Sequence, residues 1–250
     1  MNKVLKNSFR IILLSLVLFL IAGCNGKQAN VKAAGQTKNQ LSAWTVYWDA
    51  EEGSKEFRRL EKRLDEVCLF GAYFEEDGKL LLPEELTFDK RVAKKKKQLA
   101  EYLTIVNDRV LSDGGKEYKK TEFLQELLND QERRKEHIDE IIALAKAERF
   151  DGVEIDYERI WKDCETKDTF LPFIKELYAA TTANNLKLRV VLEPGTPFND
   201  IELPPGPKYV VMLYNLYGMH SGPGPKADNA FIQKVLGKMA NMPEPKAVAF

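Results

Sequence analysis

The chain has 250 residues, of which 44% are apolar and 30% are charged, and its 38 basic residues balance its 38 acidic ones. This composition suits one globular domain, a single α/β barrel fits the length, and no disordered class is indicated. Without a basic excess, nucleic acid and anionic membrane surfaces are poor partners, because both require a concentrated positive field.

The first 23 residues have the pattern of a secretory signal. Three basic residues lie within the first ten, and the apolar run from Ile11 to Ile21 is too short to span a membrane. The small residues before Cys24 resemble a bacterial lipobox, which implies that residues 1–23 are removed and that Cys24 carries a lipid. Residues 24–40 are small and polar, so we expect a tether. The mature chain, with a net charge near −3 from 35 basic and 38 acidic residues, would lie outside the cytoplasm, held to the bacterial cell membrane through this anchor only.

Two cysteines remain once Cys24 is assigned to the lipid. Cys68 lies inside a predicted strand and Cys164 in a loop far along the chain. An extracytoplasmic compartment would permit them to pair. We predict two buried thiols instead.

Three strands are predicted in the part of the chain that follows the tether. Strands are predicted from Ala43 to Trp48, from Val67 to Phe74 and from Tyr102 to Asn107. The four lysines at 94–97 are interpreted as the solvated face of a helix.

A long helical pattern runs from Thr121 to Ala147, with Asp130 as an internal cap. His137 lies on a charged part of this pattern and is interpreted as a surface residue. The apolar stripe consists of Ile138, Ile141, Ile142 and Ala145.

A second amphipathic helix is predicted from Phe170 to Thr181, with Pro172 in its first turn. Strands follow at Leu186–Leu192 and Tyr209–Tyr214. A last helix carries Phe231 to Met239.

Strand and helix alternate along the whole mature chain, which predicts an α/β fold with a parallel sheet inside a ring of helices, a (β/α)8 TIM barrel over residues 41–250. Six strands begin at residues 43, 67, 102, 151, 187 and 209, and residues 246–250 would begin a seventh. Because a barrel must close to leave no edges, we expect an incomplete barrel from a truncated sequence whose final strands are missing. An open barrel is the alternative.

The stretch from Phe150 to Glu158 carries three carboxylates on one face of a strand. Side chains of a strand alternate, so Glu154, Asp156 and Glu158 point one way and the apolar residues between them point the other. The flanking helices place the carboxylates inside the barrel, with Glu158 at the carboxyl end of the strand, where such barrels keep their chemistry. Burying uncompensated charge costs several kcal/mol per ion, so one or more carboxyls should be protonated or shared, as a general acid requires.

A metal site built from the same three carboxylates is disfavoured. Along one straight strand they spread over about 13 Å, whereas hard cations require oxygen ligands that converge from several elements. No metal and no cofactor is expected.

The segment from Asp151 to Glu158, Asp-Gly-Val-Glu-Ile-Asp-Tyr-Glu, resembles the active-site signature of glycoside hydrolase family 18 on the fourth strand of a TIM barrel. The segment Met212-Leu213-Tyr214-Asn215 looks like the sixth-strand segment that bears the family's tyrosine. Trp44 to Asp49 is similar to first strands of the bacterial chitinase-like and spore-peptidoglycan-hydrolase branches. The resemblance covers residues 43–250.

The resemblance implies a retaining, substrate-assisted glycosidase. Glu158 would protonate the glycosidic oxygen while the substrate's N-acetyl carbonyl attacks the anomeric carbon, and Glu158 would then act as the base toward water. Asp156 would orient the acetamido group, and Tyr214 would hydrogen-bond its oxygen. Glu154 and Asn215 each stand where the family often has aspartate. Both departures should shift the pH optimum or the substrate without removing the acid.

Candidates for substrate contact accompany these residues. Trp48, nearer the carboxyl end of its strand than Trp44, is the better candidate for stacking on a sugar ring. His220 lies in a glycine- and proline-rich loop and has no supporting partner in the sequence. The full set predicted to contact substrate is Trp48, Asp151, Glu193, Met212 and Asn215.

The expected partner is therefore a glycan containing β-linked N-acetylglucosamine. Chitin, peptidoglycan and the core of an N-linked glycan are left as alternatives. A non-catalytic, lectin-like barrel that binds carbohydrate is the second interpretation. Lectin-like members usually lack the acid, and Glu158 is present here.

Overall fold

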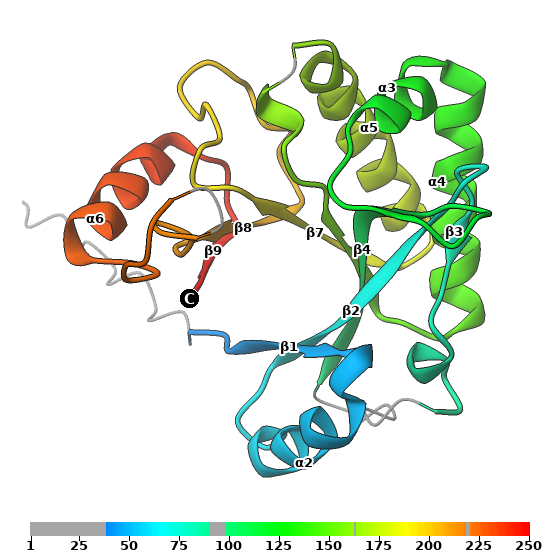
Figure 1. Ribbon diagram of the computed structural model, residues 1–250, viewed down its shortest axis with the longest axis horizontal. Coiled ribbons are helices and arrows are strands. Elements are labelled where there is room, and N and C mark those ends of the chain that lie inside the picture. The colour runs from blue at the N-terminus through cyan, green and yellow to red at the C-terminus, as the bar shows by residue number, and fades with distance from the viewer. Residues whose placement is uncertain (1–38, 91–98, 163, 219–220) are drawn as a thin grey trace, which may run out of the picture. The chain divides into compact units, whose positions relative to one another are not determined.

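The computed structural model describes residues 39–90, 99–162, 164–218 and 221–250 (Figure 1). Within these ranges no helix has the length and apolar character that a membrane span needs. The expectations for residues 1–23, Cys24, nearly all of the tether, the lysines at 94–97 and His220 lie outside the described residues.

Seven parallel strands form one sheet, and each pairs with the next along the chain. Figure 1 shows that the sheet curls into a half-barrel, with helices on its convex side. This confirms the predicted α/β architecture of an incomplete TIM barrel with a seventh strand after residue 245. The strands are β1 (Ser42–Val46), β2 (Glu66–Glu75), β4 (Ala100–Val110), β6 (Gly152–Asp156), β7 (Lys187–Leu192), β8 (Lys208–Met212) and β9 (Lys246–Ala249).

Two short strands extend the sheet as hairpins at the carboxyl ends of their partners. β3 (Leu80–Leu81) pairs antiparallel with β2, and β5 (Lys116–Glu117) pairs antiparallel with β4. The second hairpin carries the chain across the mouth of the half-barrel, toward the end of β6.

Five helices and four 3-10 turns complete the described fold. α4 packs against β6, and α5 packs against both β7 and α3. The helices are α2 (Ala50–Leu60), α3 (Glu122–Asn129), α4 (Gln131–Ala147), α5 (Cys164–Ala183) and α6 (Asn229–Lys238), and the turns are η2 (Tyr47–Asp49), η3 (Glu84–Leu86), η4 (Ile160–Lys162) and η5 (Met239–Asn241).

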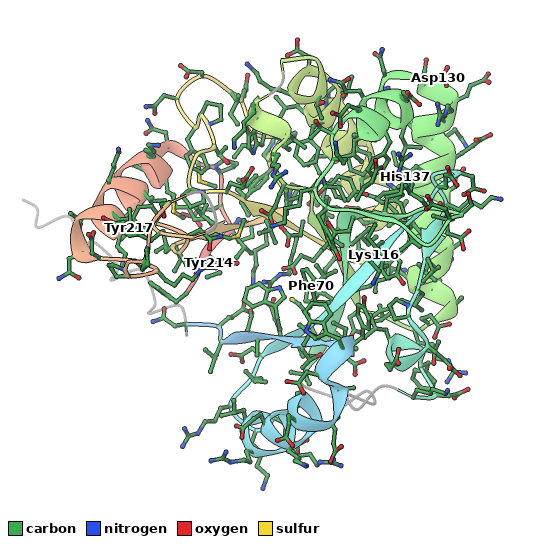
Figure 2. The ribbon with its side chains drawn as sticks, in the orientation of Figure 1. Phe70, Lys116, Asp130, His137, Tyr214 and Tyr217 are labelled. Carbon is green, nitrogen blue, oxygen red and sulfur yellow. The ribbon has the colours of Figure 1, made fainter. Side chains whose placement is uncertain are left out.

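The helical pattern from 121 to 147 is two helices and not one. Asp130 separates them with extended backbone (ψ 125°), and its side chain accepts a hydrogen bond from the Arg133 amide at 2.9 Å (Figure 2). Asp130 is therefore the N-cap of α4. The predicted apolar stripe of α4 is buried as expected.

His137 is not a surface residue. It is 2% exposed, its Nε2 lies 2.8 Å from the Tyr157 hydroxyl, and its ring stacks on Phe173 (Figure 2). His137 lies four residues before Ile141, so it is on the same face of α4 and continues the buried stripe. The residues next to it in the sequence are charged, which hid this position. Burial lowers the pKa of His137, which favours a neutral ring.

Two further expectations need correction at α5. The helix begins at Cys164, so Cys164 is not in a loop and Pro172 lies inside the helix instead of in its first turn. The residues from 164 to 169 are mostly polar, and the apolar period therefore revealed the helix only from Phe170 onwards. Cys68 is a buried free thiol, as predicted.

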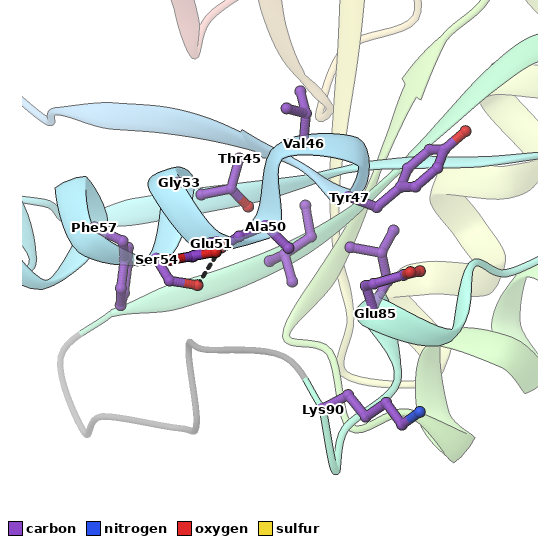
Figure 3. A pocket seen from close by; sticks show the side chains of 12 residues that line it. Thr45, Val46, Tyr47, Ala50, Glu51, Gly53, Ser54, Phe57, Glu85 and Lys90 are labelled. Atoms are coloured by element: carbon purple, nitrogen blue, oxygen red, sulfur yellow. Dashed lines mark hydrogen bonds between the residues drawn. The ribbon is translucent and has the colours of Figure 1, made fainter.

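A cavity of about 290 Å³ lies on the helical side of β1 and β2 (Figure 3). Tyr47, Phe57 and Glu85 line it, together with Thr45 and Leu69 from the strands. Neighbouring side chains of these strands, which alternate with them, point into the barrel. This cavity therefore lies on the opposite face of the sheet from the three carboxylates.

Candidate active site

Glu154 lies in the middle of the barrel interior and has no exposed surface. Its Oε1 accepts hydrogen bonds from Trp44 Nε1 at 2.6 Å and Thr104 Oγ1 at 2.8 Å. Its Oε2 accepts from Arg189 Nε at 2.7 Å and from Cys68 Sγ at 3.5 Å. One of the four partners, Arg189, is a cation that forms an ion pair with the Glu154 carboxylate and compensates its buried charge.

The register of the sheet builds this arrangement. Thr104 on β4 and Arg189 on β7 are the direct partners of Glu154 on β6. Partners at one level of a parallel barrel point the same way, so the three side chains meet at the same height inside it. Thr104 and Arg189, which are 50 and 35 positions from Glu154 in the chain, thereby contact its carboxylate.

A second carboxylate, Glu66, lies below Glu154, toward the amino ends of the strands. Arg189 Nη1 donates to Glu66 Oε2 and, at 2.9 Å, to Ser42 Oγ. Lys208 Nζ donates to Glu66 Oε1 at 2.7 Å. Burial alone would raise the pKa of Glu66, but hydrogen bonds from Lys208 and Ser42 and the charge of Arg189 together lower it. Two carboxylates and two cations are thus linked to one another here, and we call them the interior charge network: Glu66, Glu154, Arg189 and Lys208.

Asp156 lies one step nearer the mouth on the same face of β6. Its Oδ1 is buried and has no hydrogen-bond partner among the described residues. Burial, followed by the negative charges of Glu158 and Glu154, holds the pKa of Asp156 well above its usual range. The free protein therefore favours the carboxylic acid at this position.

We expect Asp156→Asn to stabilise the fold near neutral pH. The pKa of Asp156 is raised in the folded state, whereas in the unfolded state it is near about 3.9. At pH values between the two, Asp156 is ionised in the unfolded chain and protonated in the folded one. The free energy of unfolding therefore falls as pH rises through this window. The variant lacks this loss. Urea unfolding should show it more stable by about 1 kcal/mol or more at about pH 7 and equal to the wild type at about pH 3. Equal stability at both pH values would contradict the raised pKa.

Glu158 follows β6 and is fixed by its backbone. Its amide donates to Asn107 Oδ1 at 2.9 Å, and its carbonyl accepts from Asn107 Nδ2 at 3.1 Å. The Lys119 ammonium forms an ion pair with the Glu158 carboxylate, whose side chain is 16% exposed. The carboxylate of Glu158 is thus presented at the mouth of the barrel by rigid contacts to β4.

A cavity of about 490 Å³ opens at this mouth, above the carboxyl ends of β6, β7 and β8. It brings together Glu158, Glu193, Met212 and Asn215, four of the residues predicted from the sequence. Glu193 Oε2 accepts a hydrogen bond from the Arg159 amide at 2.7 Å, and burial raises its pKa. The remaining lining residues are Lys119, Arg159, Lys162, Pro194, Gly195, Gly218, Lys226 and Phe231.

Backbone strain concentrates around the same cavity. Among the described residues other than glycine, five have positive φ, and three of these line the cavity: Lys119 at 54°, Arg159 at 67° and Asn215 at 68°. Left-handed backbone costs on the order of 1 kcal/mol or more for lysine and arginine and less for asparagine, and it gathers where function requires it. This clustering supports the mouth as the functional site.

Tyr214 follows β8 and is half-buried (Figure 2). Burial raises its pKa, and the charges of Asp156, Glu158 and Glu154 raise it further. The phenol therefore lies within electrostatic reach of all three carboxylates and stays protonated, able to donate a hydrogen bond.

Two predicted contact residues lie elsewhere. Asp151 lies at the opposite end of β6, where its Oδ2 accepts a hydrogen bond from the Glu101 amide at 3.0 Å. Trp48 lies in η2 instead of the first strand, does not line the cavity, and is 63% exposed with its ring edge-to-face on Phe70. A structural role therefore replaces the predicted substrate contact of Asp151, while Trp48 is an exposed aromatic beside the mouth. Trp44, by contrast, is part of the Glu154 site.

The glycine after Asp151 has a packing reason. A Cβ at Gly152 would lie 2.5 Å from the Lys187 carbonyl oxygen and 2.7 Å from the Tyr102 ring. No larger residue fits between β4 and β7 at this level. The close approach of Gly152 to β4 and β7 fixes where β6 lies along the barrel axis, and with it the position of the carboxylates that follow.

No group of three or more histidine, cysteine, aspartate or glutamate side chains among the described residues is arranged to hold a metal ion. The three carboxylates of β6 instead have three different surroundings: donors around Glu154, a buried environment around Asp156 and a cation beside Glu158.

A comparison with protein families matches residues 43–242 to glycosyl hydrolases family 18. The chain belongs to this family. A search of curated protein sequences gave no significant match.

Solved structures of chitinases and spore cortex-lytic enzymes share the fold. A chitinase from Chromobacterium violaceum ATCC 12472 is 16% identical with a TM-score of 0.66, over 84% of this chain and 67% of its own. A mutant class V chitinase from Nicotiana tobaccum, in complex with NAG4, is 17% identical with a TM-score of 0.67, over 84% and 66%. The spore cortex-lytic enzyme SleL from Bacillus cereus is 15% identical with a TM-score of 0.66, over 84% and 49%. The match thus spans about two thirds of the chitinases and half of SleL.

Proposed function

We propose that this family 18 protein is a retaining glycosidase that cleaves glycans containing β-linked N-acetylglucosamine by a substrate-assisted reaction. The observation that supports the proposal is that the three carboxyl groups on one face of β6 have three different environments. Glu154 is saturated by four donors, Asp156 favours its protonated form, and Glu158 reaches the cavity. Such unequal carboxyls are the usual basis for assigning acid and base.

In the proposed first step, Asp156 passes its proton to Glu158, and Glu158 donates it to the glycosidic oxygen. The bond between that oxygen and the anomeric carbon breaks as the acetamido oxygen of the same sugar attacks the carbon and forms an oxazolinium ring. Asp156, now ionised, balances the positive charge, and Tyr214 donates a hydrogen bond to the acetamido oxygen. Because Glu154 is already saturated, the proton of Asp156 can move only toward the mouth.

In the second step, Glu158 accepts a proton from water as the water oxygen attacks the anomeric carbon. The ring opens, the acetamido group is regenerated, and two inversions retain the configuration. The proton then returns to Asp156. The cycle consumes one water molecule and leaves every side chain as it began.

The requirement for an acetamido group provides the test. Chitotetraose should be hydrolysed with retained configuration, visible as the β-anomer in early NMR spectra, while the fully deacetylated tetrasaccharide should react at least about 100-fold more slowly, since it supplies no internal nucleophile. Equal rates on the two would contradict the mechanism. Binding without hydrolysis across chitin, peptidoglycan and N-glycan fragments would favour the lectin-like function.

We also propose that the protein acts outside the cytoplasm, held by a lipid on Cys24. The support is the sequence of residues 1–24 alone: a basic start, a short apolar run and small residues before the cysteine.

A further inference from the structure

Lys119 occupies the mouth of the barrel in contact with the proposed acid. Its side chain is 38% exposed, and its ammonium pairs with the Glu158 carboxylate. An ion pair needs the ionised carboxylate, whereas proton donation needs the carboxylic acid. In the free protein this contact therefore opposes the first chemical step, and a substrate has to draw the ammonium away.

The contact is built by β4 and the hairpin that follows it. Lys119 has a left-handed backbone, and its amide donates to Asp108 Oδ1 at 3.0 Å. Asn107, which fixes the Glu158 backbone, also donates to the Lys120 carbonyl at 3.2 Å. One strand thus positions both partners of the ion pair. Such a conformation is held only where several contacts determine it.

Three more cations line the same cavity. Arg159, Lys162 and Lys226 are exposed, and within the described ranges none of them forms an ion pair. The second carboxylate of the cavity, Glu193, accepts a hydrogen bond from a backbone amide. The chain as a whole has equal numbers of acidic and basic residues. The excess of positive charge is therefore a local property of this cavity, and it favours an anionic occupant.

We propose that the substrate carries a carboxylate on the sugar beside the scissile bond, and that this carboxylate takes Lys119 from Glu158. The inference rests on the proposed glycosidase function and names its substrate class: an N-acetylated glycan with acidic sugars. One ammonium–carboxylate pair replaces another, so the Lys119 ammonium stays paired. Glu158, freed from its cation, then accepts the proton of Asp156. A neutral glycan leaves the Lys119 contact in place and reacts slowly.

Two tetrasaccharides test the substrate preference. One alternates N-acetylglucosamine with N-acetylmuramic acid, whose lactyl group bears a carboxylate, and the other has the same carboxylates converted to amides. We expect kcat/KM of the wild type to be about tenfold higher for the acid, the value of one charged hydrogen bond. Lys119→Met should bring the ratio to within about twofold of one, and Lys119→Arg should keep it.

Lys116 supplies the matched control. It is an exposed lysine on the same hairpin, three residues before Lys119 and outside the cavity (Figure 2). Lys116→Met should keep the preference for the acid. A ratio near one in the wild type, or an unchanged ratio in Lys119→Met, would overturn the proposal. An equal loss of activity on both substrates in Lys119→Met would overturn it too, because a merely structural role has that effect.

Binding separates this proposal from the glycosidase proposal. In Glu158→Gln, which cannot donate the proton, Lys119 faces a neutral amide in place of a carboxylate and can pair with the substrate. Calorimetry should show the acid bound about tenfold more tightly than the amide at low salt, with the difference lost when Lys119→Met is added. If no substrate is hydrolysed by the wild type but this difference persists, the glycosidase proposal fails and the acidic ligand stands. If the binding difference is absent, the acidic ligand fails.

Discussion

Glu158→Gln should lower kcat/KM on an N-acetylated oligosaccharide by about 10²- to 10⁴-fold, the usual contribution of a general acid. Glutamine keeps the size of the side chain and can accept a hydrogen bond from Lys119, but it has no proton that it can give to a glycosidic oxygen. The Asn107 contacts involve only the Glu158 backbone and are unchanged. The measurement is initial rates over a range of substrate concentrations, with thermal unfolding as the test of folding.

The control for Glu158→Gln is Glu176→Gln. Glu176 lies on α5 in an ion pair with Arg134 at 2.9 Å, on the outer, helical layer. The same chemical change there removes one carboxylate from an ion pair without touching the mouth, so activity should stay within about twofold. Equal activity of Glu158→Gln and the wild type would contradict the assignment of the acid. A loss in both variants would mean that the assay reports stability instead of catalysis.

The three carboxylates of β6 differ because the barrel surrounds each of them differently. Toward the bottom of the barrel, neighbouring strands supply donors, and both oxygens of Glu154 accept hydrogen bonds from them. One step higher, Oδ1 of Asp156 is buried without a hydrogen-bond partner among the described residues, and burial raises the pKa of this carboxyl. At the top, Glu158 meets Lys119 and the cavity. A fixed negative charge below and a removable positive charge above together direct the Asp156 proton upward.

Much of this could be predicted from the sequence, because the relevant signals are local. Alternation along residues 150–158 correctly placed Glu154 inside and Val153 against the helices. The alternation of strand and helix gave the architecture. The resemblance of residues 151–158 and 212–215 to family 18 pointed to a mouth whose cavity includes Glu158, Met212 and Asn215.

The partners of these residues could not be predicted, because they depend on register. Arg189 meets Glu154, and Lys208 meets Glu66, only when strands far apart in the chain align at particular residues. A signal did exist: Arg189 is a charged residue in the apolar run Leu188 to Leu192, where alternation points it inward. Nothing comparable marks Lys119, whose position depends on a left-handed turn between β5 and α3.

Arg189→Met should destabilise the fold by about 3–5 kcal/mol. Arg189 is 1% exposed and contacts both carboxylates of the interior charge network. Methionine fills much of its volume but leaves Glu154 without a cation and Glu66 with Lys208 alone. The pKa of Glu66 is lowered in the folded wild type, so its contribution to stability is present above the unfolded pKa near 4.3 and lost as pH falls through the folded value. The cost of the variant should accordingly shrink toward about pH 3, which urea unfolding at several pH values can follow.

Two further variants show whether charge or volume is responsible. Arg59→Met makes the same change in an exposed pair with Glu56 and should cost less than about 1 kcal/mol. Adding Glu154→Gln to Arg189→Met should recover part of the loss, because the uncompensated buried charge is removed with its partner. Two results would contradict a role for buried charge in holding this interior together. One is an Arg189→Met cost no larger than that of Arg59→Met. The other is a double variant whose loss of unfolding free energy exceeds the sum of the losses in the two single variants. The fixed charge below Asp156 would then need another source.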